Sequence, residues 1–116
     1  MKIWNKFVAW LWTFRGGYAV RYVESDELPS NLARQTLTVA REDGELWVAG
    51  MICPCGCKAK LELMLLEEAK PRWDLRVDQK GRPTLSPSVW RNQGCKAHFW
   101  LRNGKIFWCR ESVASA

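Results

Sequence analysis

The stretch that decides the fold is Cys53-Pro54-Cys55-Gly56-Cys57, which places three cysteines within five residues. Thiols this close along a chain cannot pair comfortably, because a disulfide needs Cα atoms roughly 4.4–6.8 Å apart and suitably aimed Cβ vectors. They suit a soft metal ion, since the proline and the glycine let the backbone turn while several sulfur atoms converge. The stretch therefore predicts a domain stapled by zinc.

Two further cysteines lie far from this cluster along the chain, and structural zinc sites often join distant segments in this way. We expect one structural Zn²⁺ held by four thiolates, and the sequence leaves open which cysteine is left over. A catalytic zinc is disfavoured because the chain has no H-E-x-x-H motif, and no standard ferredoxin spacing indicates an iron–sulfur cluster. The alternative, a merely buried cysteine, suits Cys109 alone. The candidate ligands are Cys53, Cys55, Cys57, Cys95 and Cys109.

The composition indicates one small globular domain. The chain has 116 residues, 47% of them hydrophobic, and eight tryptophans that can fill a thin β core. Its formal charge is +6, and four zinc-bound thiolates would lower this to about +4. Because the arginines are scattered, a nucleic-acid partner is disfavoured. The cysteines, with no convincing secretory signal, predict a reducing cytoplasmic setting.

The N-terminal segment differs from the rest of the chain. Apolar residues recur at helical spacing between Met1 and Phe14, and Gly16-Gly17 ends the pattern. We expect an amphipathic helix within residues 1–17, followed by a zinc-stapled β domain over residues 18–116. The helix is too short to span a bilayer, which takes about 20 apolar residues. It either packs on its own domain or docks on a partner or a membrane surface.

The remaining pattern predicts a mainly β (small α+β) fold, a compact antiparallel hairpin sheet. The turns Asp43-Gly44 and Asn103-Gly104 are strong hairpin signals. Residues 26–35 are expected to form a loop with a short helical turn, and residues 79–87 to be rich in turns. Strands are predicted over residues 18–23, 36–41, 45–51, 58–66, 72–77, 98–102 and 105–109.

The last hairpin can be assigned a register. A two-residue turn at Asn103-Gly104 places Arg102 opposite Lys105, and continuing outward it places His98 opposite Cys109. Directly opposed residues have Cβ atoms about 4.5–5.5 Å apart. The single histidine of the chain is therefore expected beside a cysteine.

Several motifs together resemble a small bacterial family, a domain of unknown function encoded beside ubiquitin-like conjugation genes. They are the cluster at 53–57, the run Thr84-Leu85-Ser86-Pro87-Ser88-Val89-Trp90, Cys95, His98-Phe99-Trp100 and Asn103-Gly104-Lys105. The resemblance covers about the last two thirds of the chain. It implies a zinc-containing β protein that acts as a serine-type peptidase on ubiquitin-like proteins or their conjugates. The serine after proline corresponds to Ser88, and the histidine before phenylalanine corresponds to His98.

The residues alone leave other interpretations open. Any serine/histidine pair must use His98, and the third member is open, with Asp74 and Asp78 candidates by residue type only. The histidine could instead bind zinc, the serine could be an ordinary turn residue, or Cys109 could be the nucleophile. The alternative function is a non-catalytic, zinc-stabilised module that binds a protein partner or nucleic acid.

Overall fold

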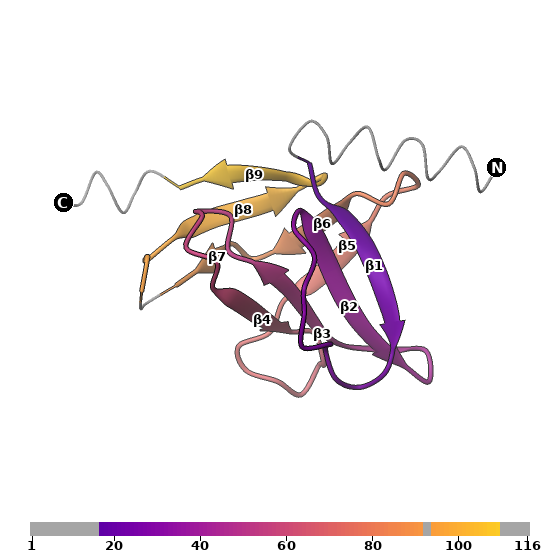
Figure 1. Ribbon diagram of the computed structural model, residues 1–116. Coiled ribbons are helices and arrows are strands. Elements are labelled where there is room, and N and C mark those ends of the chain that lie inside the picture. Colours follow the sequence, from indigo (N-terminus) through magenta and orange to yellow (C-terminus); the bar gives the residue numbers. More distant parts are fainter. Residues whose placement is uncertain (1–16, 92–93, 110–116) are drawn as a thin grey trace.

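The computed structural model describes residues 17–91 and 94–109, which form nine strands and no helix (Figure 1). The helix expected within residues 1–17 falls outside this part of the chain, except for Gly17. No helix of the described part is long and apolar enough to cross a membrane. The strands are β1 (Ala19–Glu24), β2 (Thr36–Glu42), β3 (Glu45–Ile52), β4 (Lys60–Met64), β5 (Asp74–Val77), β6 (Pro83–Ser86), β7 (Val89–Trp90), β8 (His98–Arg102) and β9 (Lys105–Trp108).

The first sheet has the order β1-β2-β3-β4. Its central hairpin turns at Asp43-Gly44, where both residues have positive φ, as predicted for a two-residue turn. The expectation of a purely antiparallel sheet is wrong, because β1 pairs with β2 in parallel. The connection over residues 25–35 is long enough for such a crossover, which takes about a dozen residues.

This crossover lies against the sheet at Gly50. A Cβ atom at that position would lie 2.6 Å from Leu28 Cδ1 and 3.2 Å from Leu32 Cδ1. The two leucines therefore approach the backbone of β3 because Gly50 has no side chain. The short helical turn expected within residues 26–35 is not formed.

The other two sheets are the β5-β6 pair and the order β7-β8-β9. β6 lies inside the stretch expected to be turns, and β7 was not predicted, so both are additions to the sequence-based assignment. The C-terminal hairpin has the predicted register, from Arg102 opposite Lys105 to Phe99 opposite Trp108. Cys109 N donates a 2.9 Å hydrogen bond to His98 O, which confirms that these two residues are neighbours.

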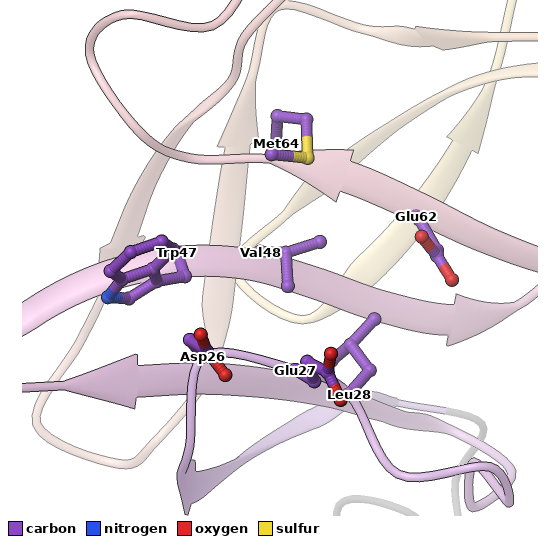
Figure 2. A pocket seen from close by; sticks show the side chains of 7 residues that line it. All are labelled: Asp26, Glu27, Leu28, Trp47, Val48, Glu62 and Met64. Atoms are coloured by element: carbon purple, nitrogen blue, oxygen red, sulfur yellow. The ribbon is translucent and has the colours of Figure 1, made fainter.

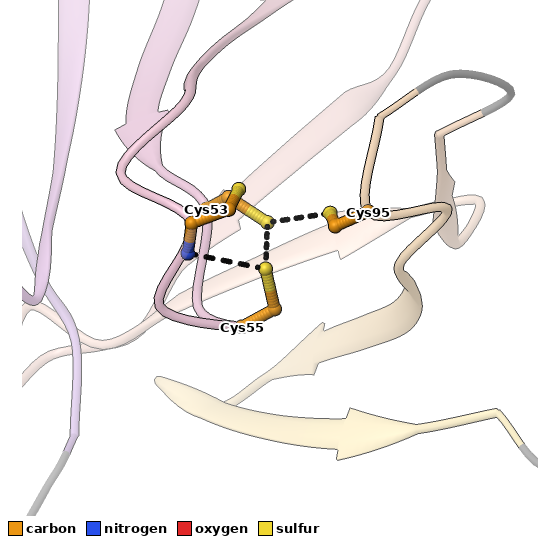
Figure 3. A group of neighbouring side chains, drawn as sticks. Cys53, Cys55 and Cys95 are labelled. Atoms are coloured by element: carbon orange, nitrogen blue, oxygen red, sulfur yellow. Dashed lines mark hydrogen bonds between the residues drawn. The ribbon is translucent and has the colours of Figure 1, made fainter.

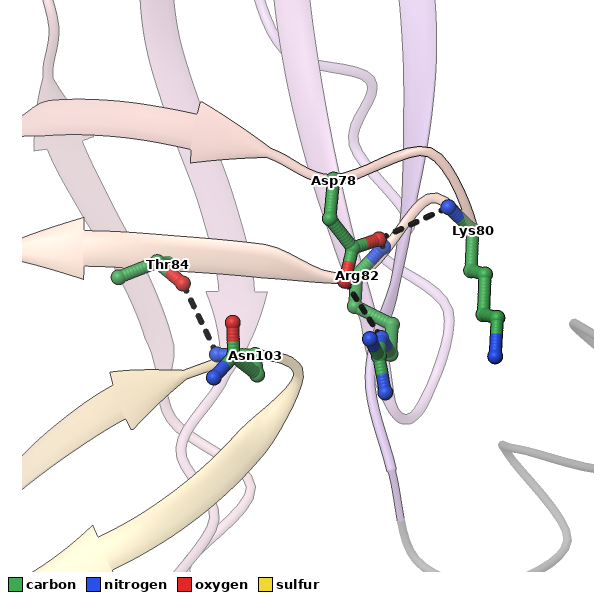
Figure 4. Close-up of polar contacts among 5 residues, drawn as sticks. All are labelled: Asp78, Lys80, Arg82, Thr84 and Asn103. Atoms are coloured by element: carbon green, nitrogen blue, oxygen red, sulfur yellow. Dashed lines mark hydrogen bonds and ion pairs between the residues drawn. The ribbon is translucent and has the colours of Figure 1, made fainter.

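The three sheets meet at the turn between β8 and β9. Asn103 N donates to Thr84 Oγ1 at 2.9 Å (Figure 4), and Gly104 N donates to Pro83 O at 2.8 Å. Tyr18 N, just before β1, donates to Gly104 O at 2.7 Å. These contacts fix β6 beside β8. Fully buried side chains lie in the shared core, among them Leu37, Val39, Met51, Leu85, Phe99 and Leu101.

Candidate functional site

Ser88 and His98 lie together at the junction of β6, β7 and β8. Ser88 sits between β6 and β7, and His98 is the first residue of β8, opposite Trp90. Ser88 Oγ is 2.9 Å from His98 Nε2. This distance lies in the range of about 2.6–3.2 Å in which a base can take a hydroxyl proton. With the ring proton on Nδ1, the hydroxyl donates to Nε2 and the imidazole is poised as its acceptor.

The local sequence explains why the serine faces outward. Leu85 and Val89 are both buried, and Ser88 lies between them with its side chain partly accessible. The backbone at this point is held by Trp73, whose Nε1 donates a 3.3 Å hydrogen bond to Ser88 O. The Ser88 hydroxyl is therefore positioned by the burial of Leu85 and Val89 and by the hydrogen bond from Trp73 to the Ser88 backbone.

The imidazole is held by an aromatic ring. Trp90 stacks on His98 with ring centroids 5.0 Å apart and an interplanar angle of 14°. Trp90 is itself 61% exposed, so its indole has one face on the imidazole and much of its surface in solvent. Sequence reasoning missed this role, although Trp90 follows Ser88 by two residues and so lies on the same side of an extended chain.

The two aspartates considered for a third role are engaged elsewhere. Asp74 forms an ion pair with Arg72 at 2.8 Å, and Asp78 pairs with Arg82. Within residues 17–91 and 94–109, no carboxylate forms an ion pair with His98. Stacking, not a carboxylate, supports the ring in the described structure.

Four of the five cysteines form a cluster, which we call the thiol cluster: Cys53, Cys55, Cys57 and Cys95. Figure 3 shows three of them, Cys53, Cys55 and Cys95. Their sulfur atoms all lie within 4.8 Å of one another, and the Cys53 sulfur is 3.4 Å from that of Cys55 and 3.6 Å from that of Cys95. Zinc–thiolate bonds of about 2.3 Å in a tetrahedron give sulfur–sulfur edges of about 3.8 Å. The donor set thus fits a tetrahedral thiophilic ion, whereas Cys109 lies outside it.

The four thiols differ in acidity. The backbone N–H of Ala97 is the main cause that lowers the pKa of Cys95, to about 6. The hydrogen bond with Cys57 is the main cause that raises the pKa of Cys55, to about 12. Binding a metal would release the remaining protons, because only thiolates are strong ligands.

The thiol cluster is connected to the Ser88–His98 pair through a short segment. Cys95 precedes His98 by three residues, and Arg91 follows Ser88 by three. Arg91 Nη1 contacts Cys95 Sγ at 3.1 Å and Cys57 Sγ at 3.4 Å, while Arg91 N donates to Ala97 O at 2.8 Å. The end of the β7–β8 hairpin is therefore fastened to the β3–β4 connection.

Comparison with known families identifies the chain. The model of a family described as bacterial ubiquitination-like system serine protease (BubE) matches residues 24–109. This chain belongs to the BubE family. The resemblance inferred from the sequence motifs is thereby confirmed, and the match covers Ser88, His98 and all five cysteines. Comparison with curated proteins and with solved structures finds no match.

A hollow of about 370 Å³ lies on the first sheet (Figure 2), and its lining does not include Ser88 or His98. Its lining includes Asp26, Glu27 and Glu62 around Trp47, whose Nε1 is buried without a hydrogen-bond partner in the described part. It contains no serine, cysteine or histidine. The Ser88–His98 pair, by contrast, holds a serine and a histidine within hydrogen-bond distance.

Proposed function

We propose that this protein is a serine-type peptidase or isopeptidase that processes or deconjugates a bacterial ubiquitin-like protein. Ser88 is the nucleophile and His98 the general base. The observation that carries the proposal is the 2.9 Å contact between Ser88 Oγ and His98 Nε2 in a member of a serine protease family. A nucleophile and a base within hydrogen-bond reach are the minimum that acyl transfer needs.

The proposed reaction follows from this geometry. His98 Nε2 accepts the hydroxyl proton as Ser88 Oγ attacks the carbonyl carbon of the substrate's peptide or isopeptide bond. The C–N bond then breaks, the imidazolium gives its proton to the departing amine, and the substrate acyl group remains as an ester on Ser88. Water hydrolyses that ester with His98 again acting as the base, which returns the free serine.

We also propose that the thiol cluster binds one structural Zn²⁺. Four thiolates would close the coordination sphere and leave no position for substrate, so the ion would supply rigidity and not chemistry. Arg91, which already contacts two of the sulfur atoms, would partly offset the charge of a four-thiolate site. The ion would fasten the hairpin on which Ser88 and His98 are placed.

Labelling with a fluorophosphonate, which phosphonylates activated serines with loss of fluoride, tests the catalytic pair. The full-length protein should be labelled at Ser88, as located by mass spectrometry. Ser88→Ala should not react, and His98→Ala should react more slowly by roughly 10²–10⁴-fold, the usual contribution of a general base. Ser30→Ala is the control, because Ser30 is an exposed serine in the connection between β1 and β2, 58 residues from Ser88 in the chain. Equal labelling of wild type and Ser88→Ala would refute the assignment.

Cleavage of a ubiquitin-like protein that carries a C-terminal extension tests the substrate class. Wild type should trim the extension, whereas Ser88→Ala and His98→Ala should not. If Ser88 is labelled but the extension stays intact, the assignment of Ser88 as a nucleophile stands and the assignment of a ubiquitin-like substrate is wrong. If no labelling and no cleavage occur, the rival function of a non-catalytic binding module gains support.

A further inference from the structure

A groove of about 610 Å³ lies along β6 and β8, and its lining includes Ser86 and Trp100, which are two residues from Ser88 and His98 in the chain. His98, Trp100 and Arg102 alternate with buried Phe99 and Leu101, so they share the outer face of β8. On β6, Thr84 and Ser86 share the corresponding outer face. The groove lining that matters here is Arg76, Thr84, Ser86, Trp100 and Arg102.

The far end of the groove is positively charged. Arg76 lies opposite Thr84 on β5, and Arg102 ends β8, with its guanidinium 4.3 Å above the ring of Trp100. Both arginines are exposed, and neither forms an ion pair with a carboxylate of the described residues. Asp78 also lines the groove, but its carboxylate is already occupied by Arg82 and by the backbone N–H of Lys80 (Figure 4). The guanidinium groups of Arg76 and Arg102 are therefore available to bind a negatively charged ligand.

We propose that this groove, which we call the arginine groove, binds an acidic, extended segment of the substrate next to the bond that is cut. The inference rests on the proposed function, because Ser86 and Trp100 in the groove lining lie two residues from Ser88 and His98 in the chain. Two guanidinium groups without a carboxylate partner favour a ligand of negative charge, and the contact with the Trp100 ring holds the Arg102 guanidinium in place.

The strand geometry also gives the position of the acidic residues. Arg102 is the fourth residue after His98, which places it about 13 Å farther along the strand. An extended substrate advances by about 3.3–3.6 Å per residue. The carboxylates that reach Arg102 therefore lie about four residues from the scissile bond, and Arg76 is placed to meet the same part of the chain, since it faces Thr84, four residues before Ser88.

Binding of defined peptides tests the inference without cleavage. Full-length Ser88→Ala is titrated into fluorescent ten-residue peptides that are glutamate-rich, serine-rich or lysine-rich, and fluorescence anisotropy is measured. The glutamate-rich peptide should bind best, and more weakly as salt rises. Adding Arg76→Glu or Arg102→Glu should weaken its binding by about fivefold each, the scale of an exposed ion pair. The matched control is Arg21→Glu, an exposed arginine on β1 outside the groove, which should leave binding unchanged.

The proposal would be overturned if the three peptides bound equally, or if Arg21→Glu weakened binding as much as the groove variants. It would also be overturned if an oligothymidylate bound more tightly than the glutamate-rich peptide and if Arg76→Glu and Arg102→Glu abolished that binding. That last result would make the groove a nucleic-acid site. Fluorophosphonate labelling of Ser88 in the Arg76→Glu and Arg102→Glu proteins separates the groove from the catalytic pair. If the two variants are still labelled at Ser88 but no longer bind the glutamate-rich peptide, the proposed role of the groove is supported. If the wild-type protein is not labelled, the proposed peptidase function is wrong, and the peptide titration alone then decides whether the groove binds acidic segments.

Discussion

Ser88 and His98 are supported by indole rings in the described part of the chain. Trp73 donates a hydrogen bond to the backbone of Ser88, and Trp90 stacks on His98. Stacking fixes the plane of the imidazole, although it does not fix its tautomer as an acceptor on Nδ1 would. The ring is therefore oriented by packing, which makes Trp90 a positioning residue.

The first prediction concerns Trp90. Trp90→Ala should slow the fluorophosphonate labelling of Ser88 by about two- to tenfold, because an aromatic pair contributes about 0.5–1.5 kcal/mol to a defined geometry. Trp90→Phe should restore most of the rate, since a ring still covers the imidazole. Tyr22→Ala removes another exposed aromatic side chain, on β1, and serves as the control. A Trp90→Ala protein that labels at the wild-type rate would show that stacking does not position the ring.

At the scale of elements, the turn between β5 and β6 is organised by one carboxylate. Asp78 Oδ1 accepts hydrogen bonds from Lys80 N and Arg82 N, both at 2.9 Å, and Oδ2 accepts one from Arg82 Nε. Burial acts to raise the pKa of Asp78, but the hydrogen bonds from Arg82 and Lys80 outweigh it and lower the pKa. The turn therefore depends on an ionised side chain.

The second prediction concerns this turn. Asp78→Ala should lower the free energy of unfolding at neutral pH by about 1–3 kcal/mol, the usual effect of losing a charge-assisted hydrogen bond. Because the folded pKa is lowered, the contribution is fully present above about pH 3.9, the unfolded value, and is lost as the pH falls through the folded value. Denaturant unfolding of both proteins should thus show a difference that closes below about pH 3.9. Asp74→Ala removes only an exposed ion pair with Arg72 and should change stability much less. If the difference in the free energy of unfolding between the two proteins persisted in acid, the ionised form of Asp78 would not be what stabilises the turn.

For the whole molecule, the thiol cluster joins the first sheet to the sheet that carries His98. Three sulfur atoms come from the β3–β4 connection and the fourth from the β7–β8 connection. A metal bound there would link segments 38 to 42 residues apart in the chain, from Cys57 and Cys53 to Cys95.

The third prediction separates the cysteines. The purified wild-type protein should contain about one zinc per chain by elemental analysis. Cys95→Ser should lose most of the metal and most of the labelling at Ser88, because the hairpin end is no longer fastened. Cys109→Ser is the matched control and should keep both, since Cys109 lies outside the thiol cluster. Chelation of the wild type should reproduce the Cys95→Ser result. Equal metal content in the two variants would contradict the ligand assignment.

The sequence by itself determined the features that depend on residues close together in the chain. The two-residue turns at 43–44 and 103–104 fixed two hairpins, and the register of the second followed by counting outward to His98 and Cys109. The cluster at 53–57 indicated a metal-binding knuckle, and the motifs around Ser88 and His98 indicated the family. Each of these signals depends on residue types and on spacings along the chain, which can be interpreted without knowledge of the packing.

Only the tertiary structure decided the rest. It showed that β1 runs parallel to β2, that Cys95 and not Cys109 joins the thiol cluster, and that Trp90 covers the imidazole. It also brought Arg76 and Arg102 to one groove from strands 26 residues apart in the chain. The physical reason is that burial of the common core selects which distant strands pair with one another. The spacing of side chains within one segment does not specify which other segment will lie beside it.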